Sequence, residues 1–227
     1  MLKSALHWLK GTRPGQITFD EIKSWVGKED AVILEIGAND GTDTKRFAET
    51  FPQARIFAFE PDPRAAERWQ AQVQSPNVTL VQTAIGNSNG TVTFHQSDGD
   101  VQDGPQTGWD LSGSIRAPKD HLKRHPHINF DQTLDVPIST LDRWAEDNNI
   151  GEIDFIWADV QGAENDLILG AQKTLSRTRL FYTEYDNREM YEGQWSLQTI
   201  SENLKDHTLI ARWKNDALFQ LKSAGKR

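Results

Sequence analysis

Short apolar runs that alternate with amphipathic segments restrict the fold of this chain more than any other feature. Five runs are mostly apolar, and they cover residues 31–36, 55–60, 78–81, 153–158 and 180–185. A strand that is buried on both faces has this composition. Because the segments between the runs have the spacing of helices, the sequence predicts a single α/β domain with a doubly wound, mostly parallel sheet.

Capping and turn signals delimit the remaining elements. Thr18-Phe-Asp-Glu21 and Ser139-Thr-Leu-Asp142 read as capping boxes, and each predicts the start of a helix. Residues 90–94 predict a short alternating strand after a polar turn. Residues 208–213 and 217–221 are joined by a short polar turn, which predicts a hairpin at the end of the chain.

Two parts of the chain lie outside this alternation. Residues 96–132 are rich in Gly, Asp, Ser, Pro and His, and we expect a long irregular insert there. Residues 1–30 are expected to form a helical extension in front of the main domain, which spans 31–227. The first helix of this extension would carry three leucines on one face: Leu2, Leu6 and Leu9.

Composition excludes several classes of protein. The 227 residues include no cysteine, which rules out a disulfide framework, a Cys-ligated metal site and a Cys nucleophile. The 33 acidic residues outnumber the 25 basic ones, and the net charge of −8 argues against nucleic-acid binding. No segment approaches the roughly 18 apolar residues of a membrane span. We therefore expect a cytoplasmic protein with neither a transmembrane segment nor a nucleic-acid partner.

The turn after the first apolar run is the clearest candidate for a ligand site. Ligands of open α/β sheets bind beyond the carboxyl ends of the strands, where Gly37 and Gly41 would let a ligand approach the backbone. No Gly-Lys-Ser/Thr follows, so this is not a Walker loop, and Asn39 occupies the second glycine position of the dinucleotide pattern. The carboxylates of Glu35 and Asp40 would repel a pyrophosphate and suit a cationic or hydroxyl-bearing ligand.

Glu60 completes this candidate site. It ends the second run, about 20 residues after the glycine turn, where a carboxylate can accept hydrogen bonds from both ribose hydroxyls. A ribose acid without a phosphate cradle indicates a nucleoside with a non-phosphate tail. S-adenosylmethionine fits, because it joins adenosine to a zwitterionic methionine that bears a sulfonium.

Several motifs carry a resemblance to a known family. The runs Ile33-Leu-Glu-Ile-Gly-Ala-Asn-Asp-Gly-Thr42 and Phe57-Ala-Phe-Glu-Pro61 look like motifs I and II of class I methyltransferases. The later runs are more specific, namely Val136-Pro-Ile-Ser-Thr-Leu-Asp142, Ile153-Asp-Phe-Ile-Trp-Ala-Asp-Val-Gln-Gly-Ala-Glu164 and Leu169-Gly-Ala171. Together they resemble the FkbM-type S-adenosylmethionine-dependent methyltransferases.

The resemblance covers about residues 31–185 and implies a Rossmann-like sheet of seven strands with an antiparallel last strand. It implies S-adenosylmethionine as the cofactor. The residues that would border the cofactor are Glu35, Gly37, Ala38, Asn39, Gly41, Glu60, Thr83, Ala84 and Ser114. The sequence departs from the family at Gln161, where Glu is usual, and at Trp157-Ala158, where a Lys-Ile or similar pair is usual.

The resemblance further implies methylation of oxygen in a sugar or another polyhydroxylated small molecule. A hydroxyl is a poor nucleophile until its proton is removed, so O-methylation usually needs a base or a metal. Asp159 and Glu184 end the fourth and fifth runs and reach the same sheet edge, so both are candidate bases. Alternatively, Asp159 caps the next helix. Asp159, Glu164 and Glu184 could also hold Mg²⁺, although nothing in their spacing requires a divalent metal.

The insert provides a third catalytic candidate, His121. On a helix, His121 and His125 would share a face, with Lys119, Lys123 and Arg124 among them. This basic cluster could provide a base, a metal pair or a contact to an acidic or phosphate-bearing acceptor. A solvated basic loop is the alternative.

Two of the eight tryptophans stand out by position. Trp109 lies in the insert and Trp157 lies two residues before Asp159, so both are candidates for an aromatic wall that stacks on a sugar ring.

Two other classes of function remain open from the residues alone. One is an NAD-dependent oxidoreductase, against which the missing second glycine and the acidic turn both count. The other is a binding protein that keeps the fold without turnover, and Gln161 is its best support.

Overall fold

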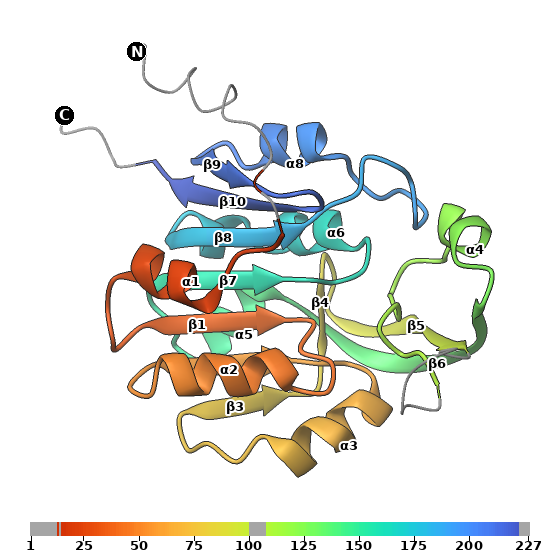
Figure 1. The fold of residues 1–227 in the computed structure, drawn as a ribbon, viewed down its shortest axis with the longest axis horizontal. Coiled ribbons are helices and arrows are strands. Elements are labelled where there is room, and N and C mark those ends of the chain that lie inside the picture. Colours follow the sequence, from red (N-terminus) through yellow and green to blue (C-terminus); the bar gives the residue numbers. More distant parts are fainter. Residues whose placement is uncertain (1–12, 14, 100–107, 223–227) are drawn as a thin grey trace.

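The computed structural model describes residues 13, 15–99 and 108–222, and it shows an α/β protein of three layers (Figure 1). The central sheet has seven strands in the order β3-β2-β1-β7-β8-β10-β9. Their bounds are β1 Val32–Ile36, β2 Arg55–Phe59, β3 Val78–Val81, β7 Ile153–Ala158, β8 Thr178–Glu184, β9 His207–Arg212 and β10 Asp216–Leu221. Only β10 runs antiparallel to its neighbours within this sheet. The predicted seven-stranded, doubly wound sheet with an antiparallel last strand is confirmed.

Helices cover both faces of this sheet, because successive residues of a strand point to opposite sides. Ile33 and Phe155 pack under the first group of helices, whereas Leu34 and Ile156 pack under the second. The first group is α1 Phe19–Val26 and α2 Thr42–Thr50, and α3 Pro63–Gln72 contacts α2. The second group is α5 Leu141–Asp147, α6 Glu164–Leu169, α7 Gln172–Leu175 and α8 Leu197–Asn203.

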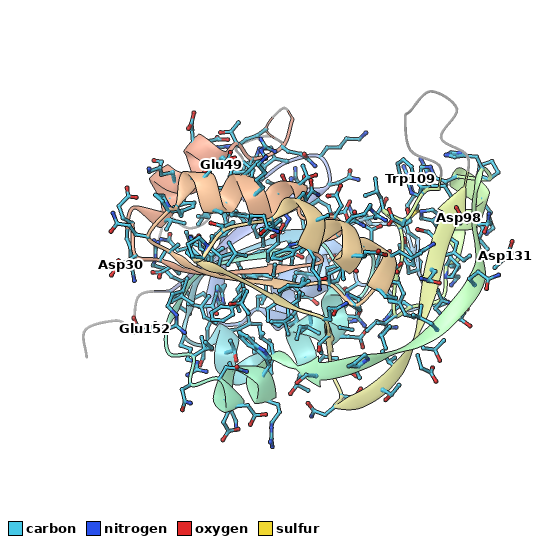
Figure 2. The ribbon with its side chains drawn as sticks, turned by 90° about the horizontal axis from the view of Figure 1, so that it is seen from below. Asp30, Glu49, Asp98, Trp109, Asp131 and Glu152 are labelled. Carbon is cyan, nitrogen blue, oxygen red and sulfur yellow. The ribbon has the colours of Figure 1, made fainter. Side chains whose placement is uncertain are left out.

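A second sheet of three strands stands beside the carboxyl ends of the main sheet, and only its 90–94 segment was expected (Figure 1). Its order is β4-β6-β5, with bounds β4 Ala84–Gly86, β5 Gly90–Gly99 and β6 Ile128–Thr140. The predicted irregular insert at 96–132 is therefore regular at both ends, because β5 extends to Gly99 and β6 begins at Ile128. The strand character of β6 is hidden in the sequence because residues 131–133 are all polar and exposed. Figure 2 shows Asp98 and Asp131 at one end of the molecule, opposite Asp30 and Glu152.

The helix α1 belongs to the same packed core as the main sheet. Thr18 and Glu21 form the predicted capping box at its start. Ile22 joins the apolar cluster that contains Phe47 of α2. The division of the chain between residues 30 and 31 stays a prediction. The predicted leucine face, Leu2, Leu6 and Leu9, lies outside the described residues. Within the described ranges, no helix is long and apolar enough to cross a membrane.

The start of α5 differs from the expectation in one detail. Thr140, rather than Ser139, is the N-cap, since its side chain accepts a hydrogen bond from the third amide of the helix. The carboxylate of Asp142 instead accepts from the backbone amides of Lys173 at 3.0 Å and Thr174 at 2.7 Å. Asp142 therefore joins α5 to α7.

We expect Asp142→Ala to lower the free energy of unfolding by about 2–4 kcal/mol, because it leaves two amides of α7 without their acceptor. Urea titration measures this loss. Asp147→Ala on the same helix removes only an exposed ion pair with Arg143 and should cost less than about 1 kcal/mol. Equal losses in the two variants would contradict the proposed link between the helices.

Candidate active site

The turn between β1 and α2 is pressed against the carboxyl end of β7. Gly37 has a φ angle of +93°, and a Cβ atom at this position would lie 1.8 Å from the carbonyl oxygen of Asp159. Only glycine satisfies both the angle and the space. Asn39 has a φ angle of +44°, a left-handed conformation that Asn adopts more readily than most residues. Asn39 thus replaces the second glycine of the dinucleotide pattern while the turn stays tight.

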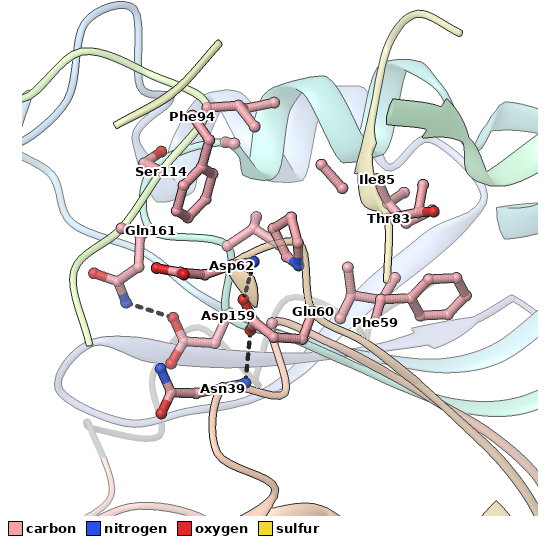
Figure 3. Close-up of a pocket in the computed structure, with 18 of the residues that line it drawn as sticks. Asn39, Phe59, Glu60, Asp62, Thr83, Ile85, Phe94, Ser114, Asp159 and Gln161 are labelled. Atoms are coloured by element: carbon pink, nitrogen blue, oxygen red, sulfur yellow. Dashed lines mark hydrogen bonds between the residues drawn. The ribbon is translucent and has the colours of Figure 1, made fainter. Parts of the chain in front are cut away.

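The backbone of this turn binds the carboxylate of Glu60, which follows β2. Its Oε2 accepts a hydrogen bond from the amide of Asn39 at 2.7 Å, and its Oε1 accepts one from the amide of Asp62 at 2.7 Å (Figure 3). Glu60 is 5% exposed. Burial raises the pKa of Glu60 to about 7, although the two hydrogen bonds act in the opposite direction. The carboxylate is fixed in place and still has lone pairs for a ligand.

A cavity of about 240 Å³ lies between this turn, the ends of β2 and β7, and the second sheet. We call it the first cavity. Its lining includes the apolar side chains of Phe59, Ile85 and Phe94 (Figure 3). Among the described residues, no Lys, Arg or His lines it, whereas four acids do: Glu60, Asp62, Asp110 and Asp159. This lining suits a flat apolar ring together with hydroxyl or cationic groups, and it opposes phosphate.

Most of the predicted cofactor residues meet at the first cavity. Six of them line it, namely Gly37, Asn39, Glu60, Thr83, Ala84 and Ser114. The other three, Glu35, Ala38 and Gly41, are not in its lining. Glu35 is buried behind the turn, where its carboxylate accepts a hydrogen bond from the hydroxyl of Thr44, and burial raises its pKa well above the usual range. A contact between these three and a cofactor stays a prediction.

Asp159 and Glu184 lie side by side because they end neighbouring parallel strands, β7 and β8. Gln161 bridges them, since its Nε2 donates to Oδ1 of Asp159 at 2.6 Å and to Oε2 of Glu184 at 3.2 Å. Burial, and then the negative charge of Asp159, raise the pKa of Glu184 well above its usual range. The pair therefore favours a proton on Glu184.

Asp159 does not cap the following helix, α6. The N-cap is Ala163, which has no side-chain cap, and the amide of Gly162 donates to Oε1 of Glu164 at 3.2 Å. Burial raises the pKa of Glu164 to about 7. In the part of the chain that the structure describes, no three His, Asp or Glu side chains are grouped so that they could hold a metal ion, and this includes Asp159, Glu164 and Glu184.

A larger cavity of about 650 Å³ shares Gln161 and Leu111 with the first one. We call it the second cavity. Glu184 lines the second cavity, whereas Asp159 lines the first. The hydroxyl of Tyr191 lies 2.8 Å from the carbonyl oxygen of Ser112 and 3.2 Å from Oε1 of Gln161, so it fixes the other end of the Gln161 amide. The two acids therefore stand at a wall common to two cavities.

His121 lines the second cavity from α4 Asp120–Arg124. It is 4% exposed, and its buried Nδ1 atom has no hydrogen-bond partner among the residues that the structure describes. Burial lowers the pKa of His121 to about 4, and the neighbouring His125 and His127 act in the same direction. His121 is thus a neutral hydrogen-bonding group at neutral pH. Its predicted catalytic role stays a prediction.

The basic cluster around His121 is smaller than its sequence indicates. Lys119 forms an ion pair with Glu189, and Lys123 forms one with Asp120. Arg124 lines the second cavity, together with His121 and His125 of the same cluster.

The two singled-out tryptophans have different positions. Trp109 lines the second cavity, and its Nε1 donates to the hydroxyl of Ser112 at 2.9 Å. Trp157 packs in the core, with its ring 4.5 Å from that of Tyr182 and 5.7 Å from that of Phe47. The predicted aromatic wall is therefore wrong for Trp157, because its side chain packs on the face of the sheet that α1 and α2 cover.

Sequence reasoning missed several residues of both cavities. Phe94 carried a weak signal, because it is an apolar residue in the alternating 90–94 run. Asp110 lies in the stretch Trp109-Asp-Leu-Ser-Gly-Ser114, which resembles a Ser-rich stretch of the family, but nothing in that stretch singled out its carboxylate. Tyr191 carried no signal, because it lies outside any motif and reaches the second cavity through the path of the chain.

Comparison with known proteins identifies the family. The sequence pattern of the methyltransferase FkbM domain matches residues 35–221. The chain belongs to the FkbM methyltransferase family. It is 45% identical over 194 residues to the 2-O-methyltransferase NoeI of Sinorhizobium fredii (strain NGR234), which covers 85% of this chain and 79% of NoeI. It is 25% identical over 229 residues to the AMB antimetabolite synthetase AmbE of Pseudomonas aeruginosa, which covers 90% of this chain but 11% of AmbE.

The fold of this FkbM methyltransferase is shared with more distant proteins. A structure from Clostridium thermocellum assigned as an rRNA methylase superposes with a TM-score of 0.50 at 12% sequence identity, over 93% of this chain and 100% of that one. This likeness concerns the fold alone. Membership of the family makes the chain a methyltransferase and decides against the NAD-dependent oxidoreductase.

We expect Gly37→Ala to lower the free energy of unfolding by at least about 2 kcal/mol, because the new Cβ atom would collide with the Asp159 carbonyl at an unfavourable φ angle. Chemical denaturation measures the effect. Gly151→Ala is the matched control, since nothing lies within 4 Å of a Cβ atom there, and it should change stability by less than about 0.5 kcal/mol. A Gly37→Ala variant as stable as the wild type would contradict the tight contact.

Proposed function

We propose that this methyltransferase transfers the methyl group of S-adenosylmethionine to a hydroxyl group of a sugar or another polyhydroxylated small molecule. One observation carries the proposal: the two cavities share Gln161, with Asp159 on one side and Glu184 on the other. A donor in the first cavity and an acceptor in the second would meet beside these two acids.

The lining of the first cavity fits S-adenosylmethionine better than a dinucleotide. Its described lining has four acids and no basic side chain. Asp62 and Asp110 form ion pairs with Arg64 and Arg68, whereas Glu60 and Asp159 form none within the described ranges and would repel phosphates and attract a cation. Glu60 would accept hydrogen bonds from the ribose hydroxyls, and Phe59 and Phe94 would pack against adenine. When bound, S-adenosylmethionine supplies a methyl group on a positively charged sulfur, which is a good leaving group.

Methylation of oxygen requires that the acceptor hydroxyl lose its proton. In the proposed mechanism Asp159 accepts this proton, and Gln161 holds the Asp159 carboxylate in one orientation through the 2.6 Å hydrogen bond. Glu184 keeps its own proton, so the group that lies next to Asp159 on the side of the second cavity is neutral. The relative NoeI is named a 2-O-methyltransferase, which supports oxygen as the methylated atom.

Calorimetry tests the cofactor. We expect S-adenosylmethionine to bind and NAD not to bind, and we expect Glu60→Ala to weaken the binding at least tenfold, because it removes the ribose acceptor. Binding of NAD without binding of S-adenosylmethionine would overturn the proposal.

The pH dependence of S-adenosylmethionine binding tests the protonation state of Glu60. Its pKa is raised to about 7, so below that pH the carboxyl group is protonated, loses its negative charge and carries a donor on one of its two oxygens. Affinity for S-adenosylmethionine should fall by up to about tenfold for each pH unit below 7 and level off above 7. Glu60→Gln should remove this slope. Glu164→Gln should keep it, although the pKa of Glu164 is also about 7. A slope that vanishes only in Glu164→Gln would contradict the assignment.

Transfer of labelled methyl groups to a panel of sugars tests the base. Asp159→Asn should lower kcat by about 10²–10⁴-fold, because it removes the proton acceptor, and should weaken S-adenosylmethionine binding far less than it lowers kcat, since Glu60 stays in the first cavity. Asp154→Asn makes the same substitution at the other end of β7 and should leave kcat within about twofold. Unchanged transfer in Asp159→Asn would exclude Asp159 as the base.

A further inference from the structure

The second cavity carries three cations from three separate segments of the chain. Arg124 is the last residue of α4, Arg188 lies in the loop after β8, and Lys214 lies in the turn between β9 and β10. Across the described ranges, no carboxylate forms an ion pair with any of the three. Segments far apart in the sequence thus bring unneutralised positive charge to one place on a chain with a net charge of −8.

Neighbouring cations in the same region are neutralised. Lys119 and Lys123 have ion-pair partners, and the guanidinium of Arg116 pairs with Asp166 at 2.6 Å. The three cations of the second cavity therefore differ from the bases around them in two respects, namely their position at the cavity and their lack of a carboxylate.

The acids of the second cavity do not cancel this charge. Burial favours the protonated, neutral form of Glu184. Asp186 is the other acid in the lining, and its Oδ1 already accepts a hydrogen bond from the backbone amide of Arg188 at 2.9 Å. One carboxylate against three cations leaves the described lining positive.

His121 adds a second, independent observation. Its side chain is buried in the wall of the second cavity, and no described residue forms a hydrogen bond with its Nδ1 atom. A buried polar atom without a partner costs free energy unless a ligand or water satisfies it. Because Nδ1 itself is enclosed by protein atoms, a ligand in this cavity would meet the His121 ring at the part of the side chain that lines the cavity.

We propose that the second cavity holds its methyl acceptor through an anionic group, a carboxylate or a phosphate, bound by Arg124, Arg188 and Lys214. Guanidinium groups bind both kinds of anion through paired hydrogen bonds, and an ammonium adds a point charge. The inference rests on the proposed function, because it specifies the acceptor class of the same site. The acceptor is then an acidic or phosphorylated sugar rather than a neutral one.

Calorimetry of the protein at low ionic strength, with three probes, tests the inference. Glucuronate carries a carboxylate, glucose 6-phosphate carries a phosphate, and glucose carries no charge. We expect at least one anionic probe to bind tenfold or more tightly than glucose, and we expect its affinity to fall as salt is raised. The stronger of the two anions identifies the source of the charge. No preference for either anion over glucose, including no binding by either, would overturn the inference.

Two double variants locate the anion. Arg124→Gln with Arg188→Gln removes two cations of the cavity and should reduce the preference for the anionic probe at least tenfold. Lys119→Gln with Lys123→Gln removes the same charge from paired lysines of the same region and should keep the preference within about twofold. Equal loss in both would indicate a general charge effect and would overturn the assignment to this cavity.

His121→Phe keeps an aromatic ring while removing both nitrogens, and it should weaken binding of the anionic probe about fivefold. S-adenosylmethionine binding, measured on the same samples, should stay unchanged in all variants. The proposed function and this inference can fail separately. Absence of S-adenosylmethionine binding would refute the proposed function, whereas the preference of the second cavity for anionic probes is measured without S-adenosylmethionine.

Discussion

The close contact between Gly37 and the backbone of Asp159 is the constraint on which the site depends. The amide of Gly37 donates to the carbonyl of Phe59 at 3.0 Å, and the amide of Asp159 donates to the carbonyl of Ile36 at 2.9 Å. These bonds fasten the ends of β1, β2 and β7 to one another. As a result Glu60 and Asp159 line one cavity although they are 99 positions apart in the sequence. Each of them directly follows a strand of the main sheet.

The main sheet and much of the lining of the first cavity could be predicted from the sequence because their signals are local. Each buried strand is a short apolar run, and each strand end is followed at once by the residue that matters, such as Gly37 or Glu60. The parallel order of the strands then brings these residues to one edge. Trp157 shows where this reasoning fails, because the alternation of a strand decides which face a side chain reaches, and both faces of this sheet are buried.

The second sheet and the second cavity could not be predicted in the same way. The strand β6 pairs with β5 through its backbone, so its polar, exposed residues 131–133 give no apolar pattern. The second cavity is assembled from α4 and from the loops after β8 and β9, and the meeting of Arg188 and Tyr191 with His121 is a matter of tertiary structure alone. The helix α5 begins close to the predicted position, but Thr140 is a simple N-cap rather than part of a capping box, because the carboxylate of Asp142 binds amides of α7 instead.

The two cavities are built from different kinds of backbone. Strand ends supply much of the first one, and their positions are fixed by the sheet, whereas loops supply most of the second, and loops tolerate insertion and substitution. Gln161 lines both cavities and has a φ angle of +50°. Its amide forms hydrogen bonds with Asp159 of the first cavity and with Tyr191 of the second. Under the proposed assignment of donor and acceptor to the two cavities, substitutions in the loops would change the acceptor, while the sheet would keep the geometry of the donor site.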